Sequence, residues 1–314
     1  MDYGLHLPLL DFGSNPYTLD HLVDYVETGR QLGFRALAAN DHLVYAKPWL
    51  DGPTAMAAVL SHSGDMDLAT TVALPVVRGP VALAKSLAAI DRLSGGRLIA
   101  CVGPGSSARD YAVVGIPFEE RWKRFDEAIQ ALRALWDQEA KSFRGNFYNT
   151  EGIRLEPFPA RKSGPPIWVG SWGSEVGLRR VARLADGWLA SGYNTTPELF
   201  AQAWRQLQEF LFHNDKDPDA FPNALASMWL YITENKNEAE RMLKEVLAPT
   251  LNRPVDELRQ RLPIGSVQDC AKKLAAYQRV GVQRIYFWPL ANEVEQIKIF
   301  MNQVAPLIQR EIKT

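Results

Sequence analysis

At 314 residues, with 46% hydrophobic and 23% charged side chains, the chain has the composition of a globular protein that buries a large core without disulfide or metal staples. A formal net charge of −1 and the lack of a Lys/Arg block exclude a general attraction to nucleic acid or to an anionic membrane surface. The length fits two domains, or one β/α barrel as a single unit.

Short apolar runs alternate with amphipathic stretches from one end of the chain to the other, a pattern typical of β/α units around a parallel sheet. The runs are almost continuously apolar, as strands covered on both faces require. The eight expected strands span residues 3–8, 36–40, 68–74, 98–102, 167–170, 187–190, 224–232 and 284–288. Eight strands are what a closed barrel needs, so we expect one eight-stranded parallel β/α (TIM) barrel domain over residues 1–314, with insertions.

The stretches between the strands carry helix signals. Phe125, Ile129, Leu132 and Trp136 recur at spacings of four, three and four, which places one apolar stripe on a helix over residues 119–136. Ser-Val-Gln-Asp at 266–269 and Asn-Glu-Val-Glu at 292–295 resemble capping boxes. Thr-Pro at 196–197 predicts a cap followed by proline at the first helical position.

Two regions interrupt the alternation. Residues 137–166 form an aromatic insertion punctuated by proline, in which Phe-Arg-Gly-Asn-Phe-Tyr at 143–148 suits a hairpin. The second region, residues 247–263, lies between the seventh strand and the helix expected to begin at Ser266. Insertions of this kind usually decorate the active-site face of a barrel or an oligomer contact.

The two cysteines, Cys101 and Cys270, each lie in an apolar periodic segment, which favours reduced core thiols and a cytoplasmic protein. The first residues lack the charged and apolar regions of a signal peptide, and no apolar run approaches the ~18 residues of a membrane span. No zinc-protease, C-x-x-C, nucleophile-elbow or P-loop motif is present, so we expect no metal site and no hydrolytic chemistry of those kinds.

Asp41 and His42 follow the second expected strand, a position that faces the catalytic mouth of a barrel. The imidazole of His42 can act as an acid, a base or a hydrogen-bond donor there, or it can merely cap a loop. Asp41 can orient the imidazole, although neighbouring side chains at a strand end often point apart. Arg78, after the third strand, either neutralises a phosphate or supports the mouth through a carboxylate.

Two glycine-rich loops also follow strands. Gly103-Pro-Gly105-Ser106 lets the backbone approach a flat ring or a phosphate, and on its own is more often a tight turn. Residues 170–174, Gly-Ser-Trp-Gly-Ser, join the fifth strand to a helix, so free amides and hydroxyls converge at the positive end of the helix dipole. This loop is either a phosphate cradle or a capped helix start with nothing bound.

Several of these segments together resemble the bacterial luciferase-like monooxygenase family. The matching stretches, in order and spacing, are Leu-Pro-Val-Val-Arg-Gly-Pro at 74–80, Leu-Ala-Lys at 83–85, Leu-Ser-Gly-Gly-Arg-Leu at 93–98, Val-Gly-Pro-Gly at 102–105, Arg121, Pro-Pro-Ile-Trp-Val-Gly at 165–170 and Ala-Asp-Gly-Trp at 185–188. The resemblance covers nearly the whole chain and implies the same barrel fold. It also implies an oxidoreductase that uses reduced FMN or a deazaflavin at the C-terminal mouth.

The resemblance assigns roles to individual residues. It places His42 beside the reactive ring as the catalytic residue, with Asp41 in the cofactor site. It implies a cis peptide bond between Thr71 and Val72, with Val72 pressed against the ring. The remaining cofactor contacts that it implies are Gly103, Gly105 and Ser106 near the ring, and Gly170, Ser171, Trp172, Gly173 and Ser174 near the phosphate. Several deazaflavin-dependent members have an acid where this chain has Ser106, so the acid chemistry of this chain is expected to differ.

Two chemistries follow from such a site. With FMN, dioxygen reacts at the reduced ring and an organic substrate is oxygenated; with a deazaflavin, a hydride moves to or from carbon. The resemblance also implies a small-molecule substrate, a homo-oligomer with a dimer as the first expectation, and a separate flavin reductase in the FMN case. The alternatives from other classes are a barrel isomerase or aldolase acting on a phosphorylated metabolite, and a non-catalytic barrel subunit.

Overall fold

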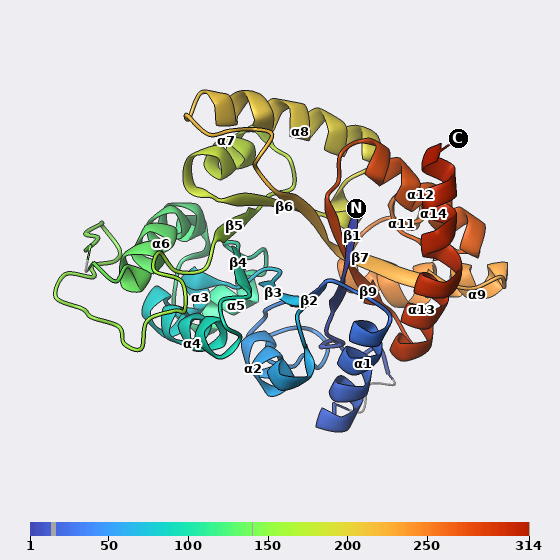
Figure 1. Cartoon of the computed structure of the whole chain (residues 1–314), viewed down its shortest axis with the longest axis horizontal. Coiled ribbons are helices and arrows are strands. Elements are labelled where there is room, and N and C mark those ends of the chain that lie inside the picture. The colour runs from blue at the N-terminus through green and yellow to red at the C-terminus, as the bar shows by residue number, and fades with distance from the viewer. Residues whose placement is uncertain (14–16, 140, 314) are drawn as a thin grey trace.

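The strands lie in the centre of the molecule and the helices surround them, in a computed structural model that describes residues 1–13, 17–139 and 141–313 (Figure 1). The barrel strands are β1 (Asp2–His6), β2 (Ala36–Ala39), β3 (Asp67–Thr70), β4 (Leu98–Val102), β5 (Ile167–Gly170), β6 (Gly187–Ser191), β7 (Asn223–Ile232) and β9 (Arg284–Pro289). Each strand pairs in parallel with the next, and the pairs β6–β7, β7–β9 and β9–β1 close the ring. The expected eight-stranded parallel barrel is confirmed.

A ninth, two-residue strand, β8 (Ile264–Gly265), pairs with the end of β7 outside the ring. The third barrel strand is shorter than expected, because regular pairing ends at Thr70 and only an isolated bridge joins Ala73 to Val102. Between these points the peptide bond from Thr71 to Val72 is cis, which confirms the prediction for that bond.

The inside of the barrel is filled by side chains from alternate strand positions, as in other closed β/α barrels. This inner cluster consists of Ala36, Ala38, Ala69, Ile99, Cys101, Trp168, Leu189, Ala224, Ala226 and Tyr286. Two glycines make room for its largest members. A Cβ on Gly4 would lie 2.6 Å from the ring of Tyr286, and one on Gly187 would lie 2.4 Å from the ring of Trp168. The larger core lies between the strands and the helices.

The helices are α1 (Leu19–Gln31), α2 (Gly52–Ala58), α3 (Pro75–Arg78), α4 (Pro80–Leu93), α5 (Ala108–Val113), α6 (Arg121–Trp136), α7 (Glu175–Leu184), α8 (Pro197–Phe212), α9 (Lys236–Arg241), α10 (Ala248–Leu251), α11 (Val255–Arg261), α12 (Val267–Arg279), α13 (Glu293–Ile299) and α14 (Ala305–Lys313). Short 3₁₀ turns lie at η1 (Leu60–His62), η2 (Phe118–Glu120) and η3 (Gly192–Asn194), and π-helical turns at η4 (Met242–Leu247) and η5 (Phe300–Val304).

Two of the three predicted caps are confirmed. The Ser266 hydroxyl accepts the amide of Asp269 at the start of α12, and the Thr196 hydroxyl accepts the amide of Leu199 ahead of α8. The capping box at Asn292 is wrong, because Asn292 adopts a left-handed conformation (φ 49°, ψ 47°) and its side chain caps no amide. A cap residue needs an extended backbone to turn its side chain toward the first turn of the helix.

The segment between α6 and β5 loops away from the barrel, at the left of Figure 1. Within it, residues 143–150 form a tight hairpin with a bridge between Arg144 and Asn149. Residue 140 of this predicted insertion lies outside the described residues. The region predicted as a second insertion contains α10 and α11. No helix within residues 1–13, 17–139 and 141–313 is both long enough and apolar enough to cross a membrane.

Candidate active site

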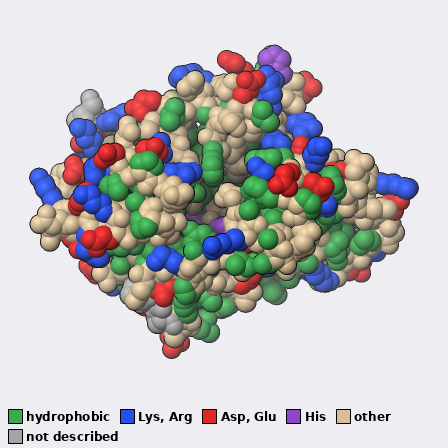
Figure 2. All heavy atoms as spheres, turned by 180° about the vertical axis from the view of Figure 1, so that it is seen from behind, with side chains coloured by type: hydrophobic (Ala, Val, Ile, Leu, Met, Phe, Trp, Pro, Cys, Tyr) green, Lys and Arg blue, Asp and Glu red, His purple; other side chains and the backbone are tan. Residues whose placement is uncertain are grey.

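A cavity of about 680 Å³ opens at the C-terminal ends of β2 to β7. Its wall contains His42 and every residue predicted to contact a cofactor except Gly173, which belongs to the same loop as its neighbours Trp172 and Ser174. Figure 2 shows a face that is hollowed near its centre, with hydrophobic side chains around the hollow and histidine atoms inside it. The topology therefore brings together residues that are scattered from position 41 to position 174.

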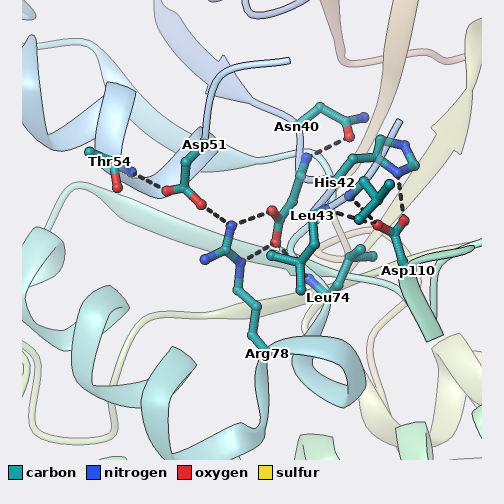
Figure 3. Close-up of polar contacts among 10 residues, drawn as sticks. Asn40, His42, Leu43, Asp51, Thr54, Leu74, Arg78 and Asp110 are labelled. Carbon is teal, nitrogen blue, oxygen red and sulfur yellow. Dashed lines mark hydrogen bonds and ion pairs between the residues drawn. The ribbon is translucent and has the colours of Figure 1, made fainter. Parts of the chain in front are cut away.

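Arg78 supports the mouth through carboxylates, one of the two roles left open by the sequence. Its Nε and Nη2 donate to Oδ2 and Oδ1 of Asp41 at 2.7 and 2.6 Å, and Nη2 also contacts Asp51, which caps α2 (Figure 3). Asp41 is 2% exposed and also accepts the amide of Leu74. Its carboxylate is thus committed to holding the loops after β2 and β3 together.

The imidazole of His42 is oriented by Asp110, not by Asp41. Nδ1 of His42 lies 2.7 Å from Oδ2 of Asp110, and Oδ1 of Asp110 accepts the amides of Leu43 and Val44 at 2.9 and 2.8 Å (Figure 3). Asp110 lies in the first turn of α5 and is 1% exposed. Sequence reasoning missed it, because an acid three residues after the cap Ser107 looks like an ordinary helix start.

The Asp110 carboxylate fixes which ring nitrogen of His42 carries the proton. Burial by itself raises the pKa of Asp110, but the hydrogen bonds from His42 and from the amides of Val44 and Leu43 outweigh burial and hold the pKa below its ordinary value. An ionised carboxylate only accepts hydrogen bonds, so Nδ1 of His42 must be the protonated nitrogen. The other nitrogen, Nε2, is left to exchange protons with a ligand.

Two polar side chains, His6 and Asn40, form hydrogen bonds with Thr71 and so hold the backbone at the cis bond to Val72. Nε2 of the fully buried His6 lies 3.0 Å from the Thr71 hydroxyl, and Nδ2 of Asn40 donates to the Thr71 carbonyl at 2.7 Å. The His6 ring is stacked on Trp288 at 4.3 Å. Burial lowers the pKa of His6 to about 3, so this histidine is neutral and serves as packing and as a hydrogen-bond partner.

Val72 lies between two backbone segments that have no side chains. A Cβ on Gly103 would lie 2.8 Å from one methyl of Val72, and a Cβ on Gly170 would lie 3.0 Å from the other. Any other residue at either position would push into Val72. The glycines therefore leave a floor made of one valine and bare backbone.

The loop from β5 to α7 presents hydroxyls and amides to the cavity. The Ser171 hydroxyl accepts the amide of Gly173 and the Ser174 hydroxyl accepts the amide of Gly177, both at 3.3 Å. Each hydroxyl thus retains its proton for donation. The first amides of an α-helix have no acceptor within the helix, so the start of α7 adds free donors and a positive dipole end.

Two arginines of the cavity wall were not predicted as site residues. Arg180 in α7 is paired with Asp126 and lies over the ring of Trp122. Arg121, at the start of α6, lies 3.9 Å from the ring of Phe118 and donates to the Phe118 carbonyl. It has no carboxylate partner within the described part of the chain. Arg121 was among the motif residues, but a motif alone does not show where a long side chain ends.

The opposite wall comes from β6, η3 and β7 and was not predicted at all. It contains Ser191 and Tyr193 together with Ala226 and Ser227. The register of β7 against β9 shifts between Leu225 and Met228, and Ser227 has a φ of 51°. Such bulges commonly redirect a side chain next to an active site. Nothing in an apolar ten-residue run marks the position of a bulge.

Comparison with known proteins places the chain among flavin and deazaflavin enzymes. The profile of the family described as luciferase-like monooxygenase matches residues 8–284. The F420-dependent hydroxymycolic acid dehydrogenase of Mycobacterium tuberculosis is 30% identical over 184 residues, 55% of this chain and 49% of the relative. The FMNH(2)-dependent dimethylsulfone monooxygenase of Pseudomonas putida is 33% identical over 132 residues, 41% and 36% of the two chains. The crystal structure of monooxygenase RslO1 from Streptomyces bottropensis superposes with a TM-score of 0.83 at 20% identity, covering 98% of this chain and 99% of that one.

Proposed function

The chain belongs to the luciferase-like monooxygenase family, and we propose that it is an oxidoreductase that binds reduced FMN or a deazaflavin in the mouth cavity and acts there on a small organic substrate. The observation that carries this proposal is the composition of one cavity. A bare floor at Val72, an oriented histidine and the free amides of a helix start face the same space. The hydroxymycolic acid dehydrogenase is described as F420-dependent and the dimethylsulfone monooxygenase as FMNH(2)-dependent, and both cofactors fit the proposal.

The floor of the cavity suits a flat ring system. Gly103 and Gly170 make room for Val72, since a Cβ at these positions would lie 2.8 and 3.0 Å from its methyl groups, and the three residues line the cavity with only one small side chain. Gly105, with a φ of 79°, lies close to Leu74 beside this floor. In the proposal the tricyclic ring rests on Val72, and the hydroxyl groups of Ser106 and Thr71 lie at the edge of the ring.

The start of α7 suits the phosphate of either cofactor. The hydroxyls of Ser171 and Ser174 and the free amides of the helix start are donors, and the helix dipole favours an anion at this point. Arg121 lines the same cavity with a guanidinium that has no acidic partner among the described residues. Arg78 is excluded from this role, since Asp41 and Asp51 already neutralise it.

When bound, the reduced cofactor supplies the electrons or the hydride for the reaction. The protein supplies position and proton control. Because Asp110 holds the proton on Nδ1, Nε2 of His42 is a base in the neutral ring and an acid in the charged ring. The rings of Tyr45 and Trp49 lie 4.9 and 4.7 Å from His42 and pack against its imidazole. This chain has Ser106 where several deazaflavin-dependent members have an acid, and Asp110, which does not line the cavity, acts through His42.

The proposal extends to the setting of the enzyme. The whole chain is one barrel domain with two insertions, and it forms a homodimer. If the cofactor is FMN, a separate reductase supplies it in the reduced form. Cys101 and Cys270 are buried free thiols, which supports a reducing, cytoplasmic compartment. Light scattering of the pure protein tests the dimer.

A binding titration tests the central proposal. The pure protein is titrated with FMN and, separately, with the deazaflavin, each oxidised and reduced, while absorbance and fluorescence are followed. We expect saturable binding of at least one cofactor. His42→Ala should retain that affinity and lose at least about 100-fold in turnover, the usual loss when an acid or base is removed. The matched control is His62→Ala, which removes a half-exposed histidine paired with Glu27. Absence of binding by either cofactor would overturn the proposal.

A further inference from the structure

A chain of hydrogen bonds leads from the second insertion to the cavity wall opposite the predicted cofactor loops. Arg253 follows α10 and donates to Oδ1 of Asn194 from Nη2 at 3.2 Å and from Nε at 3.4 Å. Nδ2 of Asn194 donates in turn to the hydroxyl oxygen of Ser191 at 3.0 Å. Ser191 ends β6 and lines the cavity.

This chain sets the direction in which Ser191 donates. The amide group of Asn194 has a defined orientation, because its oxygen faces the guanidinium and its nitrogen faces the hydroxyl. The hydroxyl oxygen of Ser191 is therefore an acceptor for Asn194, and its proton is left for another partner. Tyr193 lines the same part of the cavity, and burial raises the pKa of Tyr193 above its ordinary value, against the lowering effect of Asn194, Arg253 and Ser191. Tyr193 therefore stays protonated at neutral pH.

We propose that Ser191 and Tyr193 donate hydrogen bonds to an uncharged oxygen of the substrate, the carbonyl oxygen of a ketone or the hydroxyl oxygen of the corresponding alcohol. Asn194 and Arg253 are positioning residues that hold the two donors in place. This assignment rests on the proposed function, since it concerns the space left beside the cofactor.

The charge of this wall argues for an uncharged substrate group. The arginines of the cavity wall, Arg121 and Arg180, come from α6 and α7 on the other side. Arg253 is not among the residues that line the cavity: its guanidinium donates to Asn194 and lies 5.8 Å from the ring of Trp172 at the mouth. A buried phosphate or carboxylate requires a facing cation, and neutral donors suit a neutral acceptor.

The insertion holds this wall at a second point and also reaches the histidine loop. Nη1 of Arg261 donates to the Tyr193 carbonyl at 3.1 Å, and the Thr250 carbonyl accepts the hydroxyl of Tyr45 at 2.9 Å. The ring of Tyr45 lies against His42. Residues 250–261 thus contact Tyr193 directly and reach His42 only through Tyr45, so the insertion links the donor pair to the proposed acid–base residue.

The experiment compares two probes of nearly equal shape that differ in one oxygen. Cyclohexanone and methylenecyclohexane are titrated into the cofactor-loaded protein, and the perturbation of cofactor absorbance gives each dissociation constant. We expect the wild-type protein to bind the ketone about two- to tenfold more tightly, the range that one or two neutral hydrogen bonds supply. Ser191→Ala should lower this preference, because only Tyr193 remains as a donor, without changing the affinity for the cofactor.

Arg253 is tested through its effect on the ratio of the two dissociation constants, that of methylenecyclohexane to that of cyclohexanone. Arg253→Met should lower the preference for the ketone, and Arg253→Lys should restore part of it, since an ammonium group can still donate to Asn194. The matched control is Arg259→Met in the same insertion, because Arg259 pairs with Glu240 and Asp256 on the outer surface. The control should leave the ratio unchanged.

Each other outcome has a defined meaning. If neither cofactor binds the wild-type protein, the proposed function fails and this assignment fails with it. If the cofactor binds but the wild-type protein does not prefer the ketone, only this assignment is overturned. It is also overturned if Ser191→Ala keeps the preference, or if a variant weakens both probes equally, since that result indicates a structural role.

Discussion

Asp110→Asn tests the orientation of His42 with the smallest change that the structure allows. Oδ1 of Asp110 accepts two backbone amides, from Leu43 and Val44, and Oδ2 faces Nδ1 of His42. An asparagine must keep its oxygen toward the two amides, so its NH₂ group faces Nδ1 of His42. An NH₂ group only donates, and Nδ1 must then accept. The proton of the neutral ring moves to Nε2, and the base on the cavity side is lost.

The expected loss of turnover follows from this move of the proton to Nε2 of His42. Loss of a correctly protonated general base lowers turnover by typically about 100- to 10,000-fold, and we expect a value in that range. The stability should change far less, by about 1–2 kcal/mol, because both amides keep an acceptor and only the charge assistance is lost. Cofactor affinity should stay within about twofold, since Asp110 itself does not line the cavity.

The assay is ¹⁵N NMR of the imidazole nitrogens, which distinguishes the two tautomers without a known substrate. The chain has five histidines, and His42→Ala assigns the relevant signals. Asp256→Asn, at a largely exposed carboxylate, is the matched control. A variant that keeps the proton on Nδ1 of His42, or that keeps wild-type turnover, would refute the argument that Asp110 sets the tautomer.

Three further changes test other parts of the site. Gly173→Asp should weaken cofactor binding more than Gly173→Ala does in the same titration. Both side chains strain a backbone with a φ of 92°, but only aspartate adds a negative charge beside the phosphate. Equal affinities of the two variants would show that the phosphate does not bind at this loop. Arg78→Met should cost about 3–5 kcal/mol in urea unfolding, because it leaves the buried Asp41 without its cation, and Asp41→Asn in the same chain should recover part of that loss. Burial lowers the pKa of His6 from 6.5 to about 3. Between these two pH values His6 takes up a proton in the unfolded chain and stays neutral in the folded protein. Stability present above pH 6.5 is therefore lost as the pH falls toward 3, by up to about 1.4 kcal/mol per pH unit, and His6→Phe should flatten the dependence measured by urea unfolding. A slope equal to that of the wild-type protein would contradict the burial of His6 as a neutral ring.

The barrel could be predicted because its strands are apolar on both faces and therefore stand out from the amphipathic helices between them. All eight runs form strands, and the ends differ by a few residues. The predicted third strand is too long at its C-terminal end, because Val72, Ala73 and Leu74 are as apolar as the strand before them. Asn292 was read as a cap from its residue type, whereas capping depends on a backbone conformation that composition does not encode.

The candidate site was predictable on one side only. Loops rich in glycine, or carrying a histidine after a strand, are visible in sequence, and the cavity collects them. Asp110 lies 68 positions from His42, and no local pattern links the two. Arg253 and Asn194 are separated by 59 positions and meet only because the second insertion folds against η3. Contacts of this kind depend on the packing of the loops, which the alternation of strands and helices does not determine.

The filled interior of the barrel has a consequence for the order in which ligands arrive. Ile99, Trp168 and Tyr286 close the space beneath Val72, and Val72 packs directly against this cluster. The cavity therefore does not continue into the barrel at this point, and a ligand that rests on Val72 lies at the bottom of the cavity. Such a ligand must enter first and leave last, because the one that covers it blocks the way out. Steady-state kinetics should accordingly show a compulsory sequence, with substrate inhibition wherever the outer ligand occupies the empty pocket ahead of the inner one.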